Sequence, residues 1–177
     1  MVKKLLKFLG LSLFFILALM AFIPKESVYF LLEKELKNFE VVISKESLQE
    51  NLFSLDITNL EVSAKGIDSA LVQEAQITLL LLSNTVELSN IKLSSLVESY
   101  LPSKIEYFQA NYSVLNPFNV TAVSHGGFGE AEASFDLSSG ALEVRLKPSK
   151  KMLNSYRSSL RKFKKSDNGE YVYAKTF

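Results

Sequence analysis

The pattern of apolar and polar residues changes twice along the 177 residues of the chain. Residues 5–23 form an apolar run whose single charge is Lys7. A helix of these 19 residues is about 28 Å long at about 1.5 Å per residue, which matches the hydrocarbon core of a bilayer. Lys3 and Lys4 precede the run, and positive charge beside a span keeps that end in the cytoplasm. We therefore expect residues 1–23 to form a short cytoplasmic start and a transmembrane anchor.

A cleaved signal peptide is the alternative for this segment, because it too begins with basic residues followed by an apolar stretch. The apolar run is longer than such a peptide needs, and no small-x-small cleavage motif follows it. Cleavage after Ala21 would place Leu19 where a small residue is required. We favour the uncleaved anchor, and under either interpretation the remainder of the chain is exported.

Residues 24–39 predict an amphipathic helix that connects the anchor to the rest of the chain. Pro24 suits a first helical turn. The apolar residues that follow it at helical spacing are Val28, Leu31, Leu32, Leu36 and Phe39. Such a helix can lie in the membrane interface, or its apolar face can cover one end of the sheet that follows. We favour the second position.

From residue 40 the period of the pattern becomes two, which indicates half-buried strands. Residues 40–147 predict a β-rich exported domain. The fold class is mainly β, with an antiparallel, curved sheet (open or barrel-like) and two or three short amphipathic helices, one of them at residues 94–101. A change of phase at residues 59–60 predicts a bulge, and residues 138–140 predict a hairpin. Four leucines at residues 79–82 predict a strand end that is buried on both faces.

The C-terminal segment, residues 148–177, predicts a basic amphipathic helix followed by a terminal strand. Met152, Tyr156 and Leu160 lie on one apolar stripe of a helix over residues 150–165. The side chains that could contact anionic lipid headgroups from this helix are Lys150, Lys151, Arg157, Arg161 and Lys162. An ordinary solvated surface helix explains the same charges, and the sequence leaves both interpretations open.

The amino-acid composition excludes several classes of function. The chain has no Cys and a single His, which excludes disulfides, thiolate metal sites and multi-histidine metal centres. Its net charge is +1, but after the first 23 residues 17 basic and 19 acidic residues remain, a net charge of −2. That balance argues against nucleic-acid binding, which needs a basic excess. We expect no nucleic-acid partner, no metal and no cofactor.

The candidate catalytic motifs are weak. His125 precedes a glycine-rich turn, but the spacing of residues 125–129 matches neither a dinucleotide fingerprint nor a phosphate-binding loop. Glu130 and Glu132 share one face of a strand, as a carboxylate pair would, yet their alternation with alanines is also that of a solvated face. We expect no catalytic residue and no enzyme activity.

Two segments resemble a family of bacterial envelope proteins. Residues 53–93 read FSLDITNLEVSAKGIDSALVQEAQITLLLLSNTVELSNIKL, and residues 125–146 read HGGFGEAEASFDLSSGALEVRL. Together with the anchor, they are similar to the type II secretion system protein N and to the periplasmic AsmA-like proteins. The resemblance implies inner-membrane attachment, a periplasmic sheet with an apolar concave side, and a role in secretion or envelope lipid handling. Lipopolysaccharide-export components, with one span and a periplasmic jelly roll, have a similar architecture.

These observations lead to two hypotheses for a single-pass protein of the bacterial inner membrane, with its N-terminus in the cytoplasm and its C-terminal domain in the periplasm. The first is a non-catalytic accessory or scaffold in secretion or envelope biogenesis, held by residues 5–23 and bound to envelope or secretion-machinery proteins. The alternative is a lipid-binding or lipid-transport module for phospholipid or lipopolysaccharide. The side chains expected on the lipid or partner surface are Phe53, Leu55, Ile57, Ile77, Leu79, Leu81, Phe128 and Phe135.

Overall fold

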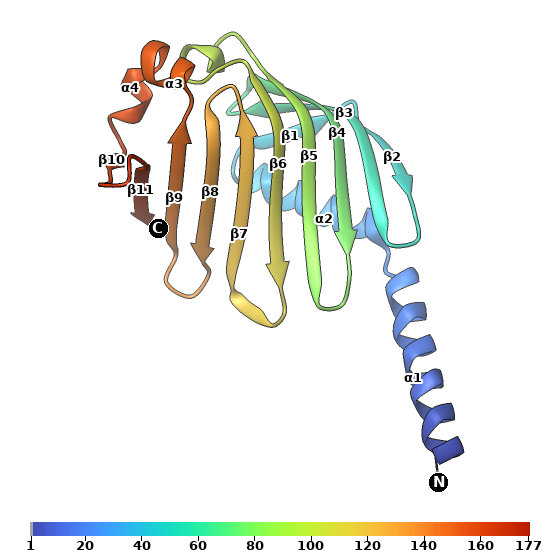
Figure 1. Ribbon diagram of the computed structural model, residues 1–177. Helices are drawn as coiled ribbons and strands as arrows, with labels where there is room; N and C mark the ends of the chain where they lie inside the picture. The colour runs from blue at the N-terminus through green and yellow to red at the C-terminus, as the bar shows by residue number, and fades with distance from the viewer. Residues whose placement is uncertain (1) are drawn as a thin grey trace.

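A single open sheet makes up most of the molecule. The computed structural model describes residues 2–177 and contains one antiparallel sheet of 11 strands, preceded by two helices (Figure 1). The sheet is not closed into a barrel. The predicted mainly β fold, with an antiparallel sheet and an N-terminal apolar helix, is therefore confirmed, and of its two predicted forms the open one is observed.

Two long helices precede the sheet, and the other helices are short. The helices are α1 (Val2–Ala21), α2 (Lys25–Asn38), the 3-10 helix η1 (Val97–Ser99), α3 (Lys150–Ser155) and α4 (Arg157–Leu160). The strands are β1 (Val41–Ser44), β2 (Ser47–Glu50), β3 (Ser54–Ala64), β4 (Ile67–Leu79), β5 (Ser83–Leu93), β6 (Lys104–Ser113), β7 (Asn116–Gly126), β8 (Gly129–Asp136), β9 (Ala141–Pro148), β10 (Lys164–Lys165) and β11 (Tyr171–Thr176). The helix α1 is long and apolar enough to span a membrane.

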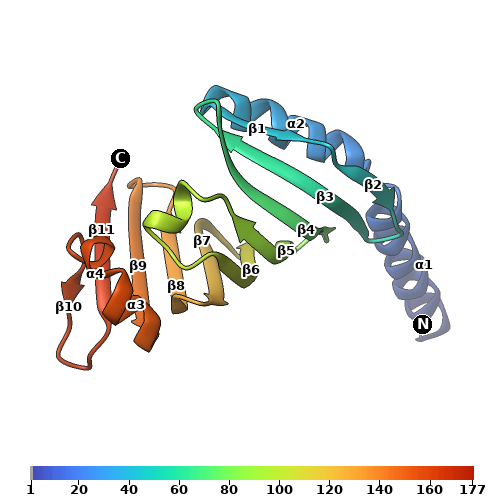
Figure 2. The ribbon, with the colours of Figure 1, turned by 90° about the horizontal axis from the view of Figure 1, so that it is seen from above.

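Strands that follow one another in the sequence are mostly neighbours in the sheet. The order is β1-β3-β4-β5-β6-β7-β8-β9-β11-β10, and β2 pairs with β3 at the end that β1 leaves free. The chain therefore follows a meander, whose turns alternate between the two ends of the strands (Figure 1). Seen from above, the sheet is curved, because β1, β2 and β3 swing away from the line of β5 to β9 (Figure 2).

The helix α2 covers the N-terminal end of the sheet (Figure 2). Glu26 in its first turn and Lys37 in its last turn suit the positive and negative ends of the helix dipole. The helix packs on β1, β2 and β3 and inserts Tyr29 among their apolar side chains. The helix lies on the sheet, as one of the two expected positions requires, but the apolar face expected to cover the sheet is wrong: Leu31, Leu32 and Phe39 are exposed, and the buried residues of α2 are Lys25 and Tyr29.

The main core lies between α2 and the N-terminal strands. Successive side chains of a strand point to opposite faces, and along β3 burial alternates accordingly, with Leu55 and Ile57 buried almost completely. Across the ladder these residues lie opposite Ile77 and Ala75 of β4, which are also buried. Tyr29 completes the cluster from the helix side.

A second, smaller core closes the end of the C-terminal strands that lies away from α1. Its buried members are Phe128, Leu146, Met152 and Leu160. Ser149 begins α3 here: its hydroxyl accepts a hydrogen bond from the Met152 N–H at 3.1 Å and donates one to the Gly127 carbonyl at 2.7 Å. Because β11 pairs with β9, residues 148–177 belong to the same sheet as the rest of the domain.

The single basic helix predicted over residues 150–165 is wrong. The helix α3 ends at Ser155, α4 adds one short turn, and β10 follows at Lys164. Ser and Asn side chains compete with the helical backbone for hydrogen bonds, and the Ser159 hydroxyl instead donates to the Tyr100 carbonyl at 2.6 Å. The helix predicted at residues 94–101 is likewise reduced to the single turn of η1.

The double burial predicted for residues 79–82 is also wrong. The strand β4 ends at Leu79, and Leu81 and Leu82 are exposed in the turn to β5. The turn forms inside the leucine run because the Leu80 N–H bonds to the Ser83 carbonyl at 3.2 Å. By contrast, the hairpin predicted at residues 138–140 is confirmed between β8 and β9.

Leu55→Ala tests the main core. The shortened side chain leaves a cavity among buried neighbours, which costs about 2 to 5 kcal/mol in the free energy of unfolding. We expect urea unfolding of the detergent-solubilised protein to show this loss. The matched control is Thr58→Ala on the exposed face of the same strand, which should change the free energy by at most about 0.5 kcal/mol. Equal effects of the two substitutions would contradict the placement of Leu55 in the core.

Asp136 stabilises the turn of the β8–β9 hairpin. Its carboxylate accepts hydrogen bonds from the Ser138 hydroxyl at 2.6 Å, the Ser139 N–H at 3.0 Å and the Ser138 N–H at 2.8 Å. These bonds favour the ionised form and lower the pKa of Asp136 from 3.8 to about 2. The contribution to stability is therefore complete above pH 3.8 and is lost as the pH falls toward 2.

A carboxyl NMR titration checks this hairpin. We expect the pKa of Asp136 to lie well below that of an ordinary aspartate. In Ser138→Ala the side-chain donor that contributes most is lost, so the pKa of Asp136 should rise. Ser139→Ala is the control, because it keeps the backbone donor and removes only the smallest contribution, so the pKa of Asp136 should rise much less than in Ser138→Ala. An ordinary pKa in the unmodified protein would disprove the network.

Candidate functional site

One part of the apolar face of the sheet has no cover. Paired residues of β6, β7, β8 and β9 form two rows across these strands. The first row is Ala110, Ala122, Ala133 and Val144, and the second is Tyr112, Val120, Phe135 and Leu142. All eight side chains are half-buried, and we call them the uncovered apolar face. Among residues 2–177, the helices that contact the sheet pack elsewhere, α2 on β1 to β3 and the short α3 at the end of β9 (Figure 1).

Small side chains occupy the centre of the uncovered apolar face. Ala110, Ala122 and Ala133 lie side by side on β6, β7 and β8. Tyr112 and Phe135 rise beside them in the second row. Because methyl groups project little from a sheet, another molecule can approach the backbone closely here while it packs against the larger side chains around the centre.

The opposite face of the same strands is polar. Glu132, Glu143 and Arg145 line a shallow depression of about 230 Å³ together with Thr121. The Arg145 Nε donates to Glu143 Oε1 at 2.6 Å, and both side chains are largely exposed. This face is therefore suited to water, and an apolar partner can gain burial only on the other face.

The eight residues expected on the partner surface fall into three environments. Four lie in the two cores, where burial leaves no free side-chain surface: Leu55, Ile57, Ile77 and Phe128. Two are half-buried: Leu79 and Phe135. Two are exposed in turns at the α1 end of the sheet: Phe53 and Leu81. Of this set, only Phe135 belongs to the uncovered apolar face. Sequence reasoning misses Ala110 and Ala122, because isolated alanines give almost no apolar signal.

The basic residues expected to contact lipid headgroups lie far from the anchor. All five are exposed in the α3–α4 region: Lys150, Lys151, Arg157, Arg161 and Lys162. This region sits at the end of the sheet opposite to α1 (Figure 1). The strand β9 runs between the two ends, and its eight residues extend about 26 Å at about 3.3 Å per residue. These charges therefore face away from the side on which α1 leaves the domain.

The candidate catalytic groups are exposed, with His125 and Glu130 near strand ends and Glu132 in the middle of β8. The His125 ring stacks on Tyr107 with their centroids 5.4 Å apart, and His125 pairs across the ladder with Glu130. Glu132 faces Arg145 on the next strand. Within residues 2–177, no group of three or more His, Asp or Glu side chains is placed to hold a metal ion.

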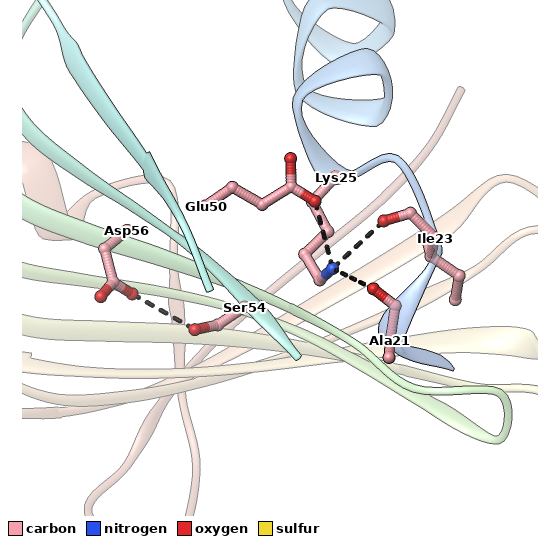
Figure 3. A network of polar contacts seen from close by, with 6 residues as sticks. All are labelled: Ala21, Ile23, Lys25, Glu50, Ser54 and Asp56. Carbon is pink, nitrogen blue, oxygen red and sulfur yellow. Dashed lines mark hydrogen bonds and ion pairs between the residues drawn. The ribbon is translucent and has the colours of Figure 1, made fainter. Parts of the chain in front are cut away.

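A buried lysine fixes the junction between α1 and the sheet (Figure 3). The Lys25 Nζ donates to the carbonyl oxygens of Ile23 at 3.1 Å and Ala21 at 3.4 Å, and to Glu50 Oε1 at 3.2 Å. A buried ammonium is tolerated only where acceptors surround it. The Ala21 carbonyl is one of those that a helix leaves unpaired at its C-terminus. Lys25 therefore joins the end of α1 to the end of β2.

Tyr29, one turn further along α2, is held in its neutral form. Burial, with the negative charge of Glu46 adding to it, raises the pKa of the Tyr29 phenol. Because an ordinary tyrosine is already neutral at pH 7, this shift extends the neutral range to still higher pH. Titration of Tyr29 therefore does not alter its contact with the sheet at physiological pH.

Comparisons with protein-family models, with curated proteins and with solved structures found no match. The resemblance to the type II secretion system protein N and the AsmA-like proteins therefore stays a prediction. The structure itself defines a class of architecture, in which a helix of membrane-spanning length is fixed to an open antiparallel sheet. The candidate site in this architecture is the uncovered apolar face.

Lys25→Met tests the junction. The variant keeps a long side chain but removes the ammonium group that donates both to Glu50 and to the carbonyls at the end of α1. We therefore expect α1 to move relative to the sheet. The chain has no Cys, so spin labels at Leu17→Cys and Gln49→Cys report one distance. Electron paramagnetic resonance should show a clearly broader distribution of that distance in the variant.

The control for this experiment is Lys37→Met. It removes the pair between Lys37 and Glu33, 2.7 Å apart on α2, whose lysine is exposed. The distance between the labels should then keep its original width, because exposed pairs contribute little. An unchanged distribution in Lys25→Met as well would show that other contacts hold the junction.

Proposed function

We propose that this chain is a non-catalytic, single-pass protein of the bacterial inner membrane. Its sheet domain lies in the periplasm and docks a partner protein of secretion or envelope biogenesis. The observation that carries this proposal is the uncovered apolar face, which belongs to a domain fixed directly to a helix of membrane-spanning length. Lys3, Lys4 and Lys7 near the start of α1 favour a cytoplasmic N-terminus.

The uncovered apolar face supports docking, because soluble domains seldom leave a contiguous apolar patch in water without a binding role. Its eight side chains come from four adjacent strands. The helix α2 already covers the corresponding face of β1, β2 and β3, so a partner surface placed on β6 to β9 would continue the same layer. The face is open on its outer side, and a protein surface covers it more completely than one acyl chain.

Lipid binding is the second candidate, and one observation favours it. The row of Tyr112, Val120, Phe135 and Leu142 is the last row before the turns at the α1 end of the strands. A lipid in the same bilayer as α1 could therefore pass an acyl chain onto this row. The basic residues of α3 and α4 lie at the other end and give such a lipid no headgroup contact.

A photo-crosslinking amino acid at Ala122 separates the two candidates in cells. Ala122 lies at the centre of the uncovered apolar face, whereas its neighbour Val123 lies on the polar face and is 41% exposed. We expect a discrete protein adduct from position 122 and none from position 123, because only position 122 contacts the docked partner. Val123 is thus the matched control on the same strand.

The chemical nature of the adduct decides the outcome. A lipid adduct at position 122 would replace the first candidate with the second. Equal adducts at both positions, or none at either, would overturn docking on this face. Both variants should keep the melting temperature of the unmodified protein, since Ala122 is only half-buried and Val123 is exposed.

A further inference from the structure

The turns at one end of the strands expose large apolar side chains. We call four segments at this end the α1-side tips: the turns at residues 51–53, 80–82 and 137–140, and residues 114–118, which comprise a turn and the start of β7. Leu115 is 80% exposed, and Phe118 is 62% exposed. The other exposed apolar side chains of the tips are Leu52, Phe53, Leu81, Leu82, Val114 and Leu137. A turn does not require large apolar side chains, so the exposure of these residues needs another explanation.

Backbone hydrogen bonds join the α1-side tips into one edge. The Leu79 N–H donates to the Phe53 carbonyl at 3.2 Å, and the Val114 N–H donates to the Leu82 carbonyl at 3.0 Å. Between the next two tips, the Leu137 N–H donates to the Phe118 carbonyl at 2.8 Å. The tips therefore stand in a row along the lower end of the sheet (Figure 1).

The anchor leaves the domain from the same edge. Lys25 ties the end of α1 to Glu50, the last residue of β2, and the first tip begins at the next residue. In Figure 1 all four turns reach toward the side on which α1 projects, level with its C-terminal turns. A bilayer that contains α1 is therefore the surface nearest to the tips.

The two ends of the strands differ in charge. The four α1-side tips contain no Lys, Arg, Asp or Glu. The charges directly beside them are Glu50, which pairs with Lys25, and Asp136, which accepts hydrogen bonds from Ser138 and Ser139 of the last tip. The turns at the other end carry charges such as Lys65, Glu98 and Lys150. That end also exposes Leu96, at 62% like Phe118. Exposure alone is therefore common to both ends, and the α1 end differs in that its tips contain no charged residue, with Glu50 and Asp136 beside them.

We infer that the α1-side tips form a second membrane contact, in which their apolar side chains insert into the periplasmic leaflet of the bilayer that α1 crosses. This inference rests on the proposed membrane insertion of α1 and goes beyond it, because the sheet domain then touches the lipid directly. Large apolar side chains among small polar residues suit the boundary between headgroups and acyl chains. A row of tips in the membrane holds the strands upright on the bilayer.

The residues of the α1-side tips determine which lipids the proposed contact needs. Since the tips carry no basic residue, their insertion depends on apolar burial and needs no anionic headgroup. Contact should therefore form on phosphatidylcholine alone and should persist at high salt. A soluble partner is the less suitable occupant, because it would have to enter between the domain and the bilayer.

Single-cysteine labelling tests this contact in the full-length protein. The chain has no Cys and no Trp, so in Leu115→Cys an environment-sensitive fluorophore attaches only at position 115, and no Trp fluorescence overlaps its signal. Leu96→Cys is the matched control, an exposed leucine at the other end of the strands. Leu13→Cys in α1 reports whether the anchor is inserted. The three variants are placed in phosphatidylcholine nanodiscs, with and without lipids that carry a quenching doxyl group.

We expect doxyl lipids to quench the labels at positions 13 and 115 and to spare the label at position 96. Iodide in the buffer should quench position 115 at least about threefold less than position 96, because ions are excluded from the acyl region. Quenching at position 13 without quenching at position 115 would overturn the membrane contact and leave the anchor in place. Loss of quenching at position 13 would overturn the anchor itself.

A second copy or another part of the chain could also shield the label. Position 115 would then be protected from iodide but insensitive to doxyl lipids, and this result too would overturn the inference. Leu115→Glu gives an independent test in the same nanodiscs, read by a label at Leu82→Cys on the neighbouring tip. Doxyl quenching at position 82 should fall in this variant, whereas Leu96→Glu should leave it unchanged.

Discussion

A single antiparallel sheet has one apolar face and no second sheet to bury it, and the rest of the structure depends on this constraint. An apolar sheet face has to pack on another layer. Here α2 supplies that layer over β1 to β3, and α3 and α4 supply it at the far end of β8 and β9. The meander provides no further element for the middle of the face. The uncovered apolar face therefore follows from the topology of the chain.

Much of the fold can be predicted because alternation is strong where strands are long. The strands β3 and β4 and the β8–β9 hairpin follow from this alternation, whereas α1 follows from a continuous apolar run and α2 from helical spacing. The strands β1 and β2, with four residues each, are too short to show a period. The phase change at Asn59 is real, since Ile57 and Leu60 are both buried, and Asn59 takes a φ of 59°, which Asn tolerates. The bulge predicted there is wrong, because the register with β4 shifts only between Val62 and Ser63.

The site is harder to predict, because apolar residues in a sequence do not show which of them remain exposed. Leu55 and Ile77 are large apolar residues, as expected on a binding surface, but they lie in the core. The alanines of β6 and β7 give almost no apolar signal in the sequence, but they lie on the uncovered apolar face. The leucines at residues 80–82 show the same difficulty. Only the position of the Leu80–Ser83 turn decides that they are exposed, and turn position depends on which strands pair.

The short connection at Lys25 also changes how the domain meets other molecules. Only Phe22, Ile23 and Pro24 separate the two long helices, and Lys25 fixes the step between them. With α1 in a membrane, as we propose, a domain held this close to it diffuses in two dimensions and explores a layer only a few nanometres deep. Its concentration toward another protein of the same membrane is then effectively millimolar. A weak interaction on its open face can therefore be occupied most of the time.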